Sequence, residues 1–179
     1  MSRMLDNTLL DALDSEERVE LSSTVWRVTW STRDPLAGSP GGGRWVYPGA
    51  CETLYTSFEA DGAIAEIYHH LSRAPVFSSS SSEVSELVVR DIEVVEISQS
   101  LLDQLGLVSD ASNSGVELRD VGEAAFKLDY QGIVVPNVRW DCKNLVLFLD
   151  RLDLSSQIEL TKSDPINWPA WKSSNVRDS

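Results

Sequence analysis

The spacing of apolar residues predicts several helices along this chain. Leucines recur at helical spacing within residues 1–20 and predict a short amphipathic helix. A second helix with an apolar stripe on one side is predicted over residues 57–72. Thr56 and Glu59 have the spacing of a capping box, which would start this second helix. Two shorter helices are predicted at residues 99–105 and 117–128.

Segments rich in β-branched and aromatic residues predict strands before and after these helices. They lie at residues 24–30, 52–56, 84–90, 92–97, 132–136, 144–149 and 157–160. Strands on both sides of a few helices are typical of an α+β fold, so we expect a central mixed or antiparallel sheet flanked by short helices. The serine run at residues 78–82 predicts a flexible loop, and the two tryptophans after Thr161 are expected to pack on the body of the protein.

The length and composition indicate one domain with two short extensions. The chain has 179 residues, and hydrophobic residues make up 42% of it, which is enough to form a core without metal ions or disulfides. We expect an N-terminal helical extension over residues 1–20, a domain over residues 21–162 and a C-terminal tail over residues 163–179.

The charge balance limits the partners that we expect for this protein. The chain has 28 acidic and 15 basic residues, which give a formal net charge of −13. Such a field opposes binding to nucleic acids and to anionic membranes, so we expect neither as a partner. A small anionic ligand is compatible with it, because salt screens distant charges and a few local arginines then dominate. The charge balance does not decide whether the protein associates with itself or with another protein.

The sequence predicts neither a membrane anchor nor an export signal. No apolar run approaches the roughly 20 residues that cross a bilayer. The N-terminal residues also lack a long apolar region with a cleavage site, so we expect a cytoplasmic protein. Cys51 and Cys142 are then expected to be two reduced thiols, with a native bridge between them as the alternative.

The histidines do not predict a metal site. His69 and His70 are the only histidines of the sequence, and Glu66 with His69 makes only half of the Glu-x-x-His pattern of a di-iron protein. The sequence also lacks a G-x-S-x-G motif, so a serine–histidine–aspartate triad is not indicated. We expect both histidines on a helix surface near its C-terminal end, where the helix dipole favours them.

Three stretches carry polar residues that suit a binding site, and each also has a simpler interpretation. Gly41–Gly43 followed by Arg44 can bring a guanidinium to a phosphate, or can form a flexible turn. Glu66 lies opposite the apolar stripe of its helix, where it faces either solvent or a cleft. The polar residues between the apolar strands of Val134–Phe148 form either a hairpin turn or the rim of a site.

Together these stretches resemble the RES family, which is named for recurring arginine, glutamate and serine residues. The matching segments are Val25–Val28, Gly42–Trp45, Leu54–Ser57, Ala63–Glu66, Gly132–Pro136 and Asn144–Phe148, in the family's order and spacing. RES proteins are toxins of bacterial toxin–antitoxin pairs of the RES–Xre type. The resemblance implies an ADP-ribosyltransferase-like fold, an activity on NAD+ and an antitoxin partner with a helix-turn-helix domain.

The resemblance also implies which residues form the site. The family's arginines correspond to Arg27 and Arg44, its tyrosine to Tyr55 and its glutamate to Glu66. Asn137 stands where the family has a serine after the late proline. The amide of Asn137 keeps the capacity to form hydrogen bonds but lacks the hydroxyl group.

These residues suggest how NAD+ would be bound and cleaved. Arg27 and Arg44 would hold the diphosphate by charge-assisted hydrogen bonds, and Tyr55 would stack on the nicotinamide or another planar part. Glu66 would accept hydrogen bonds from the ribose and stabilise positive charge as the nicotinamide–ribose bond breaks. Asn137 would orient ribose or phosphate. This chemistry requires no metal ion.

We therefore expect a toxin-type enzyme that depletes NAD+, with Glu66, Arg44 and Tyr55 as catalytic residues. Water as the acceptor would make it a glycohydrolase, and inorganic phosphate would make it a phosphorylase. One alternative is an ADP-ribosyltransferase that modifies a protein. The other, motivated by Asn137, is a catalytically weakened RES-like protein that binds the nucleotide.

Overall fold

A computed structural model describes residues 6–73, 81–107 and 117–176 of this chain. The helices in these ranges are α1 (Asn7–Asp14), α2 (Ala60–Leu71), α3 (Gln99–Gln104), α4 (Leu118–Lys127) and α5 (Trp168–Asn175), with a 3-10 helix at Leu149–Arg151. The strands are β1 (Val19–Trp30), β2 (Thr53–Ser57), β3 (Ser82–Glu96), β4 (Gly132–Pro136), β5 (Lys143–Phe148) and β6 (Ile158–Pro165).

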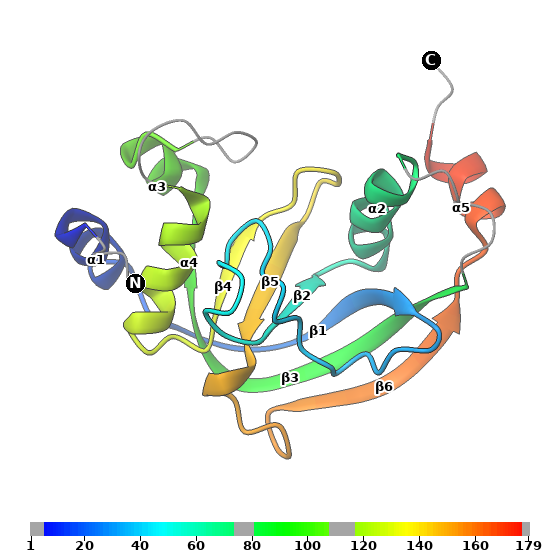
Figure 1. Cartoon of the computed structure of the whole chain (residues 1–179), viewed down its shortest axis with the longest axis horizontal. Coiled ribbons are helices and arrows are strands. Elements are labelled where there is room, and N and C mark those ends of the chain that lie inside the picture. The colour runs from blue at the N-terminus through cyan, green and yellow to red at the C-terminus, as the bar shows by residue number, and fades with distance from the viewer. Residues whose placement is uncertain (1–5, 74–80, 108–116, 177–179) are drawn as a thin grey trace.

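The strands form one mixed sheet that closes on itself. Their order is β1-β2-β5-β4-β3-β6, and β1 also pairs with β3, so the first five strands of this order form a ring. The pair β3–β4 is parallel, and the other pairings among the described strands are antiparallel. The long strands β1 and β3 run beneath the shorter strands β2, β4 and β5 (Figure 1). The expected α+β fold with a central mixed sheet and short helices is confirmed.

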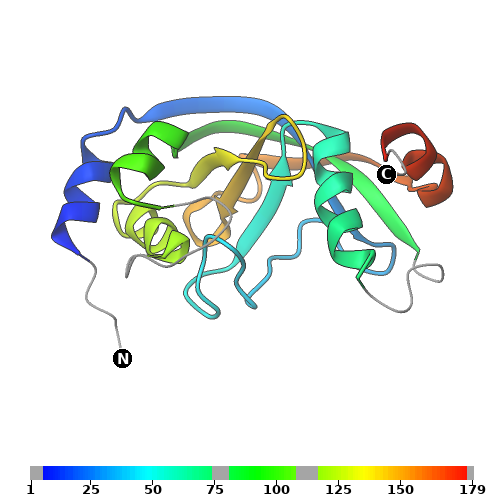
Figure 2. The same cartoon turned by 90° about the horizontal axis from the view of Figure 1, so that it is seen from above.

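Strand β5 contributes to two separate apolar cores, because successive side chains of a strand point to opposite faces. Leu145 and Leu147 pack inside the ring with Val25 of β1. Val146 and Phe148 point outward and join a second core, to which α1, α3 and α4 contribute. We call the side of β2, β4 and β5 that carries Val146 and Phe148 the outer face. Seen from above, α1, α3 and α4 gather over one end of the molecule, and α2 and α5 lie at the other (Figure 2).

The capping box predicted from Thr56 and Glu59 is wrong, and α2 begins later than residue 57. Thr56 belongs to β2, and its Oγ1 donates a hydrogen bond to the carbonyl of Leu145 at 2.8 Å. Glu59 is the N-cap residue of α2, but its side chain makes no cap hydrogen bond. Pairing with β5 therefore extends β2 over the residues that the local pattern predicted as the start of a helix.

The strands predicted at residues 84–90 and 92–97 are one continuous strand, β3. Asp91 lies between the two predicted segments with a positive φ of 50°, and its backbone N–H donates to Ser22 Oγ at 2.9 Å. The predicted serine loop is wrong at Ser82, which is buried and begins β3, whereas residues 78–80 lie outside the described residues.

The two ends of the chain are more regular than predicted. The N-terminal helix is limited to α1, whose N-cap Asp6 accepts a hydrogen bond from Thr8 N, and β1 begins at Val19 rather than at residue 24. Leu5 of the predicted stripe lies outside the described residues.

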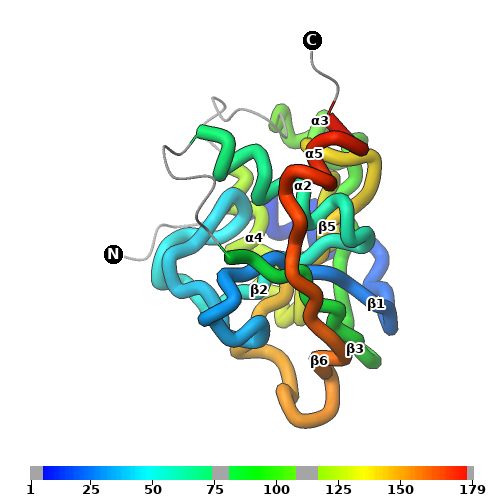
Figure 3. The backbone as a smooth tube through the Cα atoms, turned by 90° about the vertical axis from the view of Figure 1, so that its right-hand side faces the viewer, coloured from blue at the N-terminus to red at the C-terminus, as the bar shows by residue number. Residues whose placement is uncertain are grey.

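At the C-terminal end, β6 leads into α5, which lies beside α2 (Figure 3). Both tail tryptophans pack on the body, as predicted: the ring centroids of Trp168 and Trp171 lie 6.4 and 5.4 Å from that of Tyr68. The boundaries of the extension, domain and tail stay a prediction.

Candidate active site

A cavity of about 340 Å³ opens on the outer face of the sheet, beside α2. The register of β2 and β5 places Tyr55 opposite Val146 and Ser57 opposite Asn144. Residues directly opposite one another in an antiparallel pair share a face, so these four side chains belong to the outer face. The cavity therefore lies over the polar start of β5, between α2 and the glycine-rich loop.

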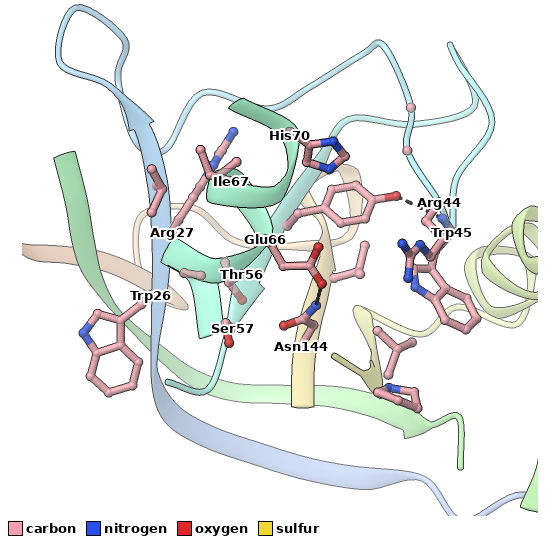
Figure 4. A pocket seen from close by; sticks show the side chains of 18 residues that line it. Trp26, Arg27, Arg44, Trp45, Thr56, Ser57, Glu66, Ile67, His70 and Asn144 are labelled. Carbon is pink, nitrogen blue, oxygen red and sulfur yellow. Dashed lines mark hydrogen bonds between the residues drawn. The ribbon is translucent and has the colours of Figure 1, made fainter. Parts of the chain in front are cut away.

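The cavity brings together four of the five residues predicted for the site. Arg27 from β1, Arg44 from the glycine-rich loop, Tyr55 from β2 and Glu66 from α2 all line it. In the view of Figure 4, Arg27 lies on one side of the Glu66 carboxylate and Arg44 on the other. Asn137 lies beside the cavity, in the loop between β4 and β5. The roles assigned to these residues stay predictions.

Close packing against two neighbours holds the glycine-rich loop in place. A Cβ atom on Gly43 would lie 2.5 Å from the Tyr55 hydroxyl, so only glycine lets the backbone cross the phenol here. The carbonyl of Gly43 accepts a hydrogen bond from Arg119 Nε of α4 at 2.9 Å. A Cβ atom on Gly122 would lie 1.8 Å from the carbonyl oxygen of Trp45, which shows how closely α4 approaches the loop. The loop is thus a fixed support for Arg44 rather than a flexible turn.

Arg27 is buried and holds a neighbouring loop. Its Nη1 donates hydrogen bonds to the carbonyls of Pro35 and Ala37, at 2.9 and 3.0 Å. Burial, together with the nearby charge of Arg33, lowers the pKa of Arg27 to about 10, and the carboxylate of Asp34 opposes this shift in part. The guanidinium still carries its charge at neutral pH, and its carbonyl acceptors are neutral. A buried positive charge next to the cavity favours an anionic ligand.

Tyr55 presents a neutral ring to the cavity. Its hydroxyl accepts a hydrogen bond from the backbone N–H of Trp45 at 3.2 Å. Burial raises the pKa of Tyr55 to about 12, and the hydrogen bond from Trp45 opposes this shift in part. The phenol is therefore protonated at neutral pH, which suits it to stacking on a ligand ring rather than to proton abstraction.

Glu66 faces the cavity, which decides between the two interpretations of its position on the helix. The helix packs Ile64 against the apolar cluster of α5, and Glu66 points from the other side toward Asn144 (Figure 4). Asn144 Nδ2 lies 3.5 Å from Glu66 Oε1. Asn137 Nδ2 in turn donates to Asn144 Oδ1 at 2.9 Å. The polar residues between the two apolar strands thus form a hairpin turn and, through Asn144 at the start of β5, one edge of the site.

Sequence reasoning missed Asn144 and His70 as lining residues. Asn144 has the same parity along β5 as Val146 and Phe148, so a polar residue interrupts an otherwise apolar face. This polar residue on an apolar strand face was a signal in the sequence that could have indicated a lining residue of the site. His70 lies one turn after Glu66 on α2, in the last turn as predicted, and it is exposed at the cavity.

Cys51 and Cys142 are free thiols, as expected for a reduced protein. Burial raises the pKa of both, that of Cys51 to about 11. Within residues 6–73, 81–107 and 117–176, no group of three or more histidine, cysteine, aspartate or glutamate side chains is arranged to hold a metal ion. No helix in the described part of the chain is both long and apolar enough to cross a membrane.

Known proteins resemble this chain in both sequence and structure. The sequence model of the RES domain matches residues 24–169. The curated NAD(+) phosphorylase MbcT of Mycobacterium bovis and of Mycobacterium tuberculosis is 27% identical over 146 residues, which cover 76% of this chain and 78% of the relative. The crystal structure of the M. tuberculosis MbcT–MbcA toxin–antitoxin complex contains a chain that matches with a TM-score of 0.82 and 23% identity, over 95% of this chain and 98% of that one.

The structural likeness shows a shared fold, and the RES sequence model spans most of the chain. The matched residues include both arginines, the tyrosine and the glutamate that line the cavity. This chain therefore belongs to the RES domain family.

Proposed function

We propose that this protein cleaves the nicotinamide–ribose bond of NAD+ and transfers the ADP-ribosyl group to inorganic phosphate. The observation that carries the proposal is the meeting of two arginines, a tyrosine and a glutamate around one cavity. Membership of the RES family and the name of the curated relative, an NAD(+) phosphorylase, support it. The outcome for the cell is NAD+ depletion, which suits a toxin.

Each residue has a role that its position supports. Arg44, on the rigid glycine-rich loop, binds the diphosphate, and the charge of buried Arg27 adds to the attraction. Tyr55 stacks on the nicotinamide ring. Glu66 accepts hydrogen bonds from the ribose hydroxyls and stabilises the positive charge that develops at the sugar as the bond breaks.

The bond changes balance without an added acid or metal ion. A phosphate oxygen forms a bond to the anomeric carbon of the ribose while the bond from that carbon to the nicotinamide nitrogen breaks. The electron pair of the broken bond neutralises the positive ring nitrogen, so nicotinamide leaves as a neutral molecule. The other product is ADP-ribose carrying phosphate on its anomeric carbon.

The test is nicotinamide release from NAD+ by the purified protein, with and without inorganic phosphate. Release that requires phosphate, with a phosphorylated ADP-ribose product, supports the proposal. Release into free ADP-ribose without phosphate indicates a glycohydrolase instead, and labelled NAD+ on a protein band indicates an ADP-ribosyltransferase. Tight NAD+ binding without any product would identify a catalytically weakened relative and would overturn the proposed activity.

We also propose a cognate antitoxin as a partner, because the structural neighbour MbcT is found in a toxin–antitoxin complex. The partner is expected to block access to the cavity, and the pair is expected in the cytoplasm, where the substrate is available. Purified antitoxin added to the phosphate-dependent assay should stop nicotinamide release, and unchanged release would remove this part of the proposal.

A further inference from the structure

Two asparagine side chains connect the turn before β5 to Glu66. Asn137 Nδ2 donates to Asn144 Oδ1 at 2.9 Å, and Asn144 Nδ2 lies 3.5 Å from Glu66 Oε1. Asn137 Nδ2 also lies 3.3 Å from the carbonyl oxygen of Gly62, in the helix that carries Glu66. The three side chains therefore form a chain of polar contacts that ends at the proposed catalytic carboxylate.

Backbone contacts fix the direction of this chain. Asn137 Oδ1 accepts hydrogen bonds from the backbone N–H groups of Arg139 and Trp140, at 2.8 and 3.0 Å. A backbone N–H can only donate, so the oxygen of Asn137 must face the turn and its NH₂ group must face Asn144. Asn144 then accepts with its oxygen, which leaves its own NH₂ group pointing at Glu66.

We propose that Asn144 is a positioning residue for Glu66, and that Asn137 acts through Asn144 by fixing the orientation of its amide. This inference rests on the proposed NAD+ cleavage and assigns Asn137 a place outside the substrate contacts. It revises the sequence-based expectation that Asn137 itself orients ribose or phosphate.

The geometry explains why a donor is useful at this place. An NH₂ group on Glu66 Oε1 limits the rotation of the carboxylate, which leaves Oε2 available to the ribose. The contact of 3.5 Å is long for a hydrogen bond, and we expect it to shorten when substrate binds.

The close approach of α2 makes the arrangement sensitive to small changes. A Cβ atom on Gly62 would lie 2.4 Å from Ser57 Oγ and 3.2 Å from Asn137 Nδ2. The helix therefore rests directly on β2 and on the turn, and Asn137 contacts both the helix backbone and the side chain that faces Glu66. The side-chain amide of Asn137 thus links the position of α2 to the orientation of Asn144.

Nearly isosteric substitutions test the proposal. Asn144→Asp keeps the acceptor for Asn137 but replaces the NH₂ group with a negative oxygen facing Glu66. We expect kcat to fall about 100-fold, with KM within about twofold of the wild-type value, because positioning is lost while substrate contacts remain. Asn137→Asp keeps the acceptor for the two backbone N–H groups but cannot donate to Asn144, and we expect about a tenfold fall in kcat. Asn7→Asp, at an exposed position of α1, adds the same charge and should change neither constant.

Two results would overturn the inference. If both variants keep kcat within twofold of an active wild type, Asn144 does not position Glu66. If KM rises while kcat is unchanged, Asn144 binds substrate directly instead.

A second measurement works even if the wild-type protein does not consume NAD+. The side-chain NH₂ resonances of Asn144, followed by ¹H–¹⁵N NMR, should move in Asn137→Asp and in Glu66→Gln but not in Asn7→Asp. If they stay in place in both variants, the chain of contacts is absent whatever the activity. Shifted resonances in a protein without turnover would support the contacts and remove the proposed function.

Discussion

The outer face of β5 has one end sealed by helices and one end open to a cavity. At the sealed end, Phe148 is fully buried and meets the ring of Phe126 from α4 edge-on, with 5.6 Å between centroids. At the open end, Asn144 lines the cavity and points to Glu66. Both residues belong to one strand of six residues and share one face.

The difference lies in what covers the strand. An amphipathic helix over the sealed end excludes water, so apolar side chains there contribute mainly to stability. At the open end α2 directs the carboxylate of Glu66 toward the start of β5, and polar side chains keep access to a ligand. A substitution at one end should therefore change stability, and a substitution at the other should change catalysis.

Of the predicted substitutions, Glu66→Gln should lower catalysis the most while leaving stability nearly unchanged. We expect a fall of about 1,000-fold in kcat/KM, because a neutral amide cannot stabilise the positive charge that develops at the ribose. The free energy of unfolding should change by less than about 0.5 kcal/mol, since no apolar contact is removed. Nicotinamide release and urea denaturation measure the two effects, with Glu17→Gln on the surface as the control. Full activity in Glu66→Gln would refute the site assignment.

Phe148→Ala should lower stability while leaving catalysis nearly unchanged. Removing this ring from the sealed end should lower the free energy of unfolding by about 3–5 kcal/mol, measured by urea denaturation. The remaining folded protein should keep kcat within about threefold at low temperature. Leu160→Ala on β6, where the residue is 38% exposed, removes an apolar group at a smaller cost and serves as the control. A destabilisation below about 1 kcal/mol would mean that the sealed end is not a tightly packed core.

Tyr55 lies at the boundary between the two ends, and high pH should reveal its burial. Its pKa is raised to about 12, so the folded state holds the phenol proton more tightly than the unfolded chain, whose phenol titrates near 10. This contribution is complete below about pH 10 and is lost as the pH rises toward 12. Arg27, with a pKa lowered to about 10, acts in the opposite direction over that range, so the comparison must be with Tyr55→Phe.

Between pH 9 and pH 12 the wild-type protein should lose about 2 kcal/mol more stability than Tyr55→Phe, as measured by urea denaturation at each pH. Parallel losses in the two proteins would show that the phenol is accessible to water in the folded state.

Arg44→Lys should give the smallest change in free energy of these substitutions. It tests whether the diphosphate binds to Arg44 at the open end. A lysine keeps the positive charge but lacks the planar fork that pairs with two phosphate oxygens. We expect KM for NAD+ to rise about tenfold, equivalent to about 1.4 kcal/mol, with kcat nearly unchanged. Initial-rate kinetics supply both constants. An unchanged KM would indicate that the diphosphate binds elsewhere.

Much of the fold could be predicted because its elements carry clear local patterns. The apolar runs of β4 and β5 and the amphipathic pattern of α4 predicted these elements to within a few residues. The start of α2 could not be predicted, since Thr56 fits a capping box locally but pairs with β5 in the fold. The long strand β3 was divided in two because Asp91 is a poor strand residue that the pairing with β1 accommodates.

The sequence by itself determined most of the elements, the α+β class and the residues that resemble the RES family, because these depend on side-chain type and spacing along the chain. Only the tertiary structure decided that Glu66 faces a cavity rather than solvent, and that Asn144 rather than Asn137 lines it. Helical periodicity gives the side of a helix but not what lies against that side. That choice depends on the packing of α2 on β2 and on the register of β5, which bring together residues far apart in the chain.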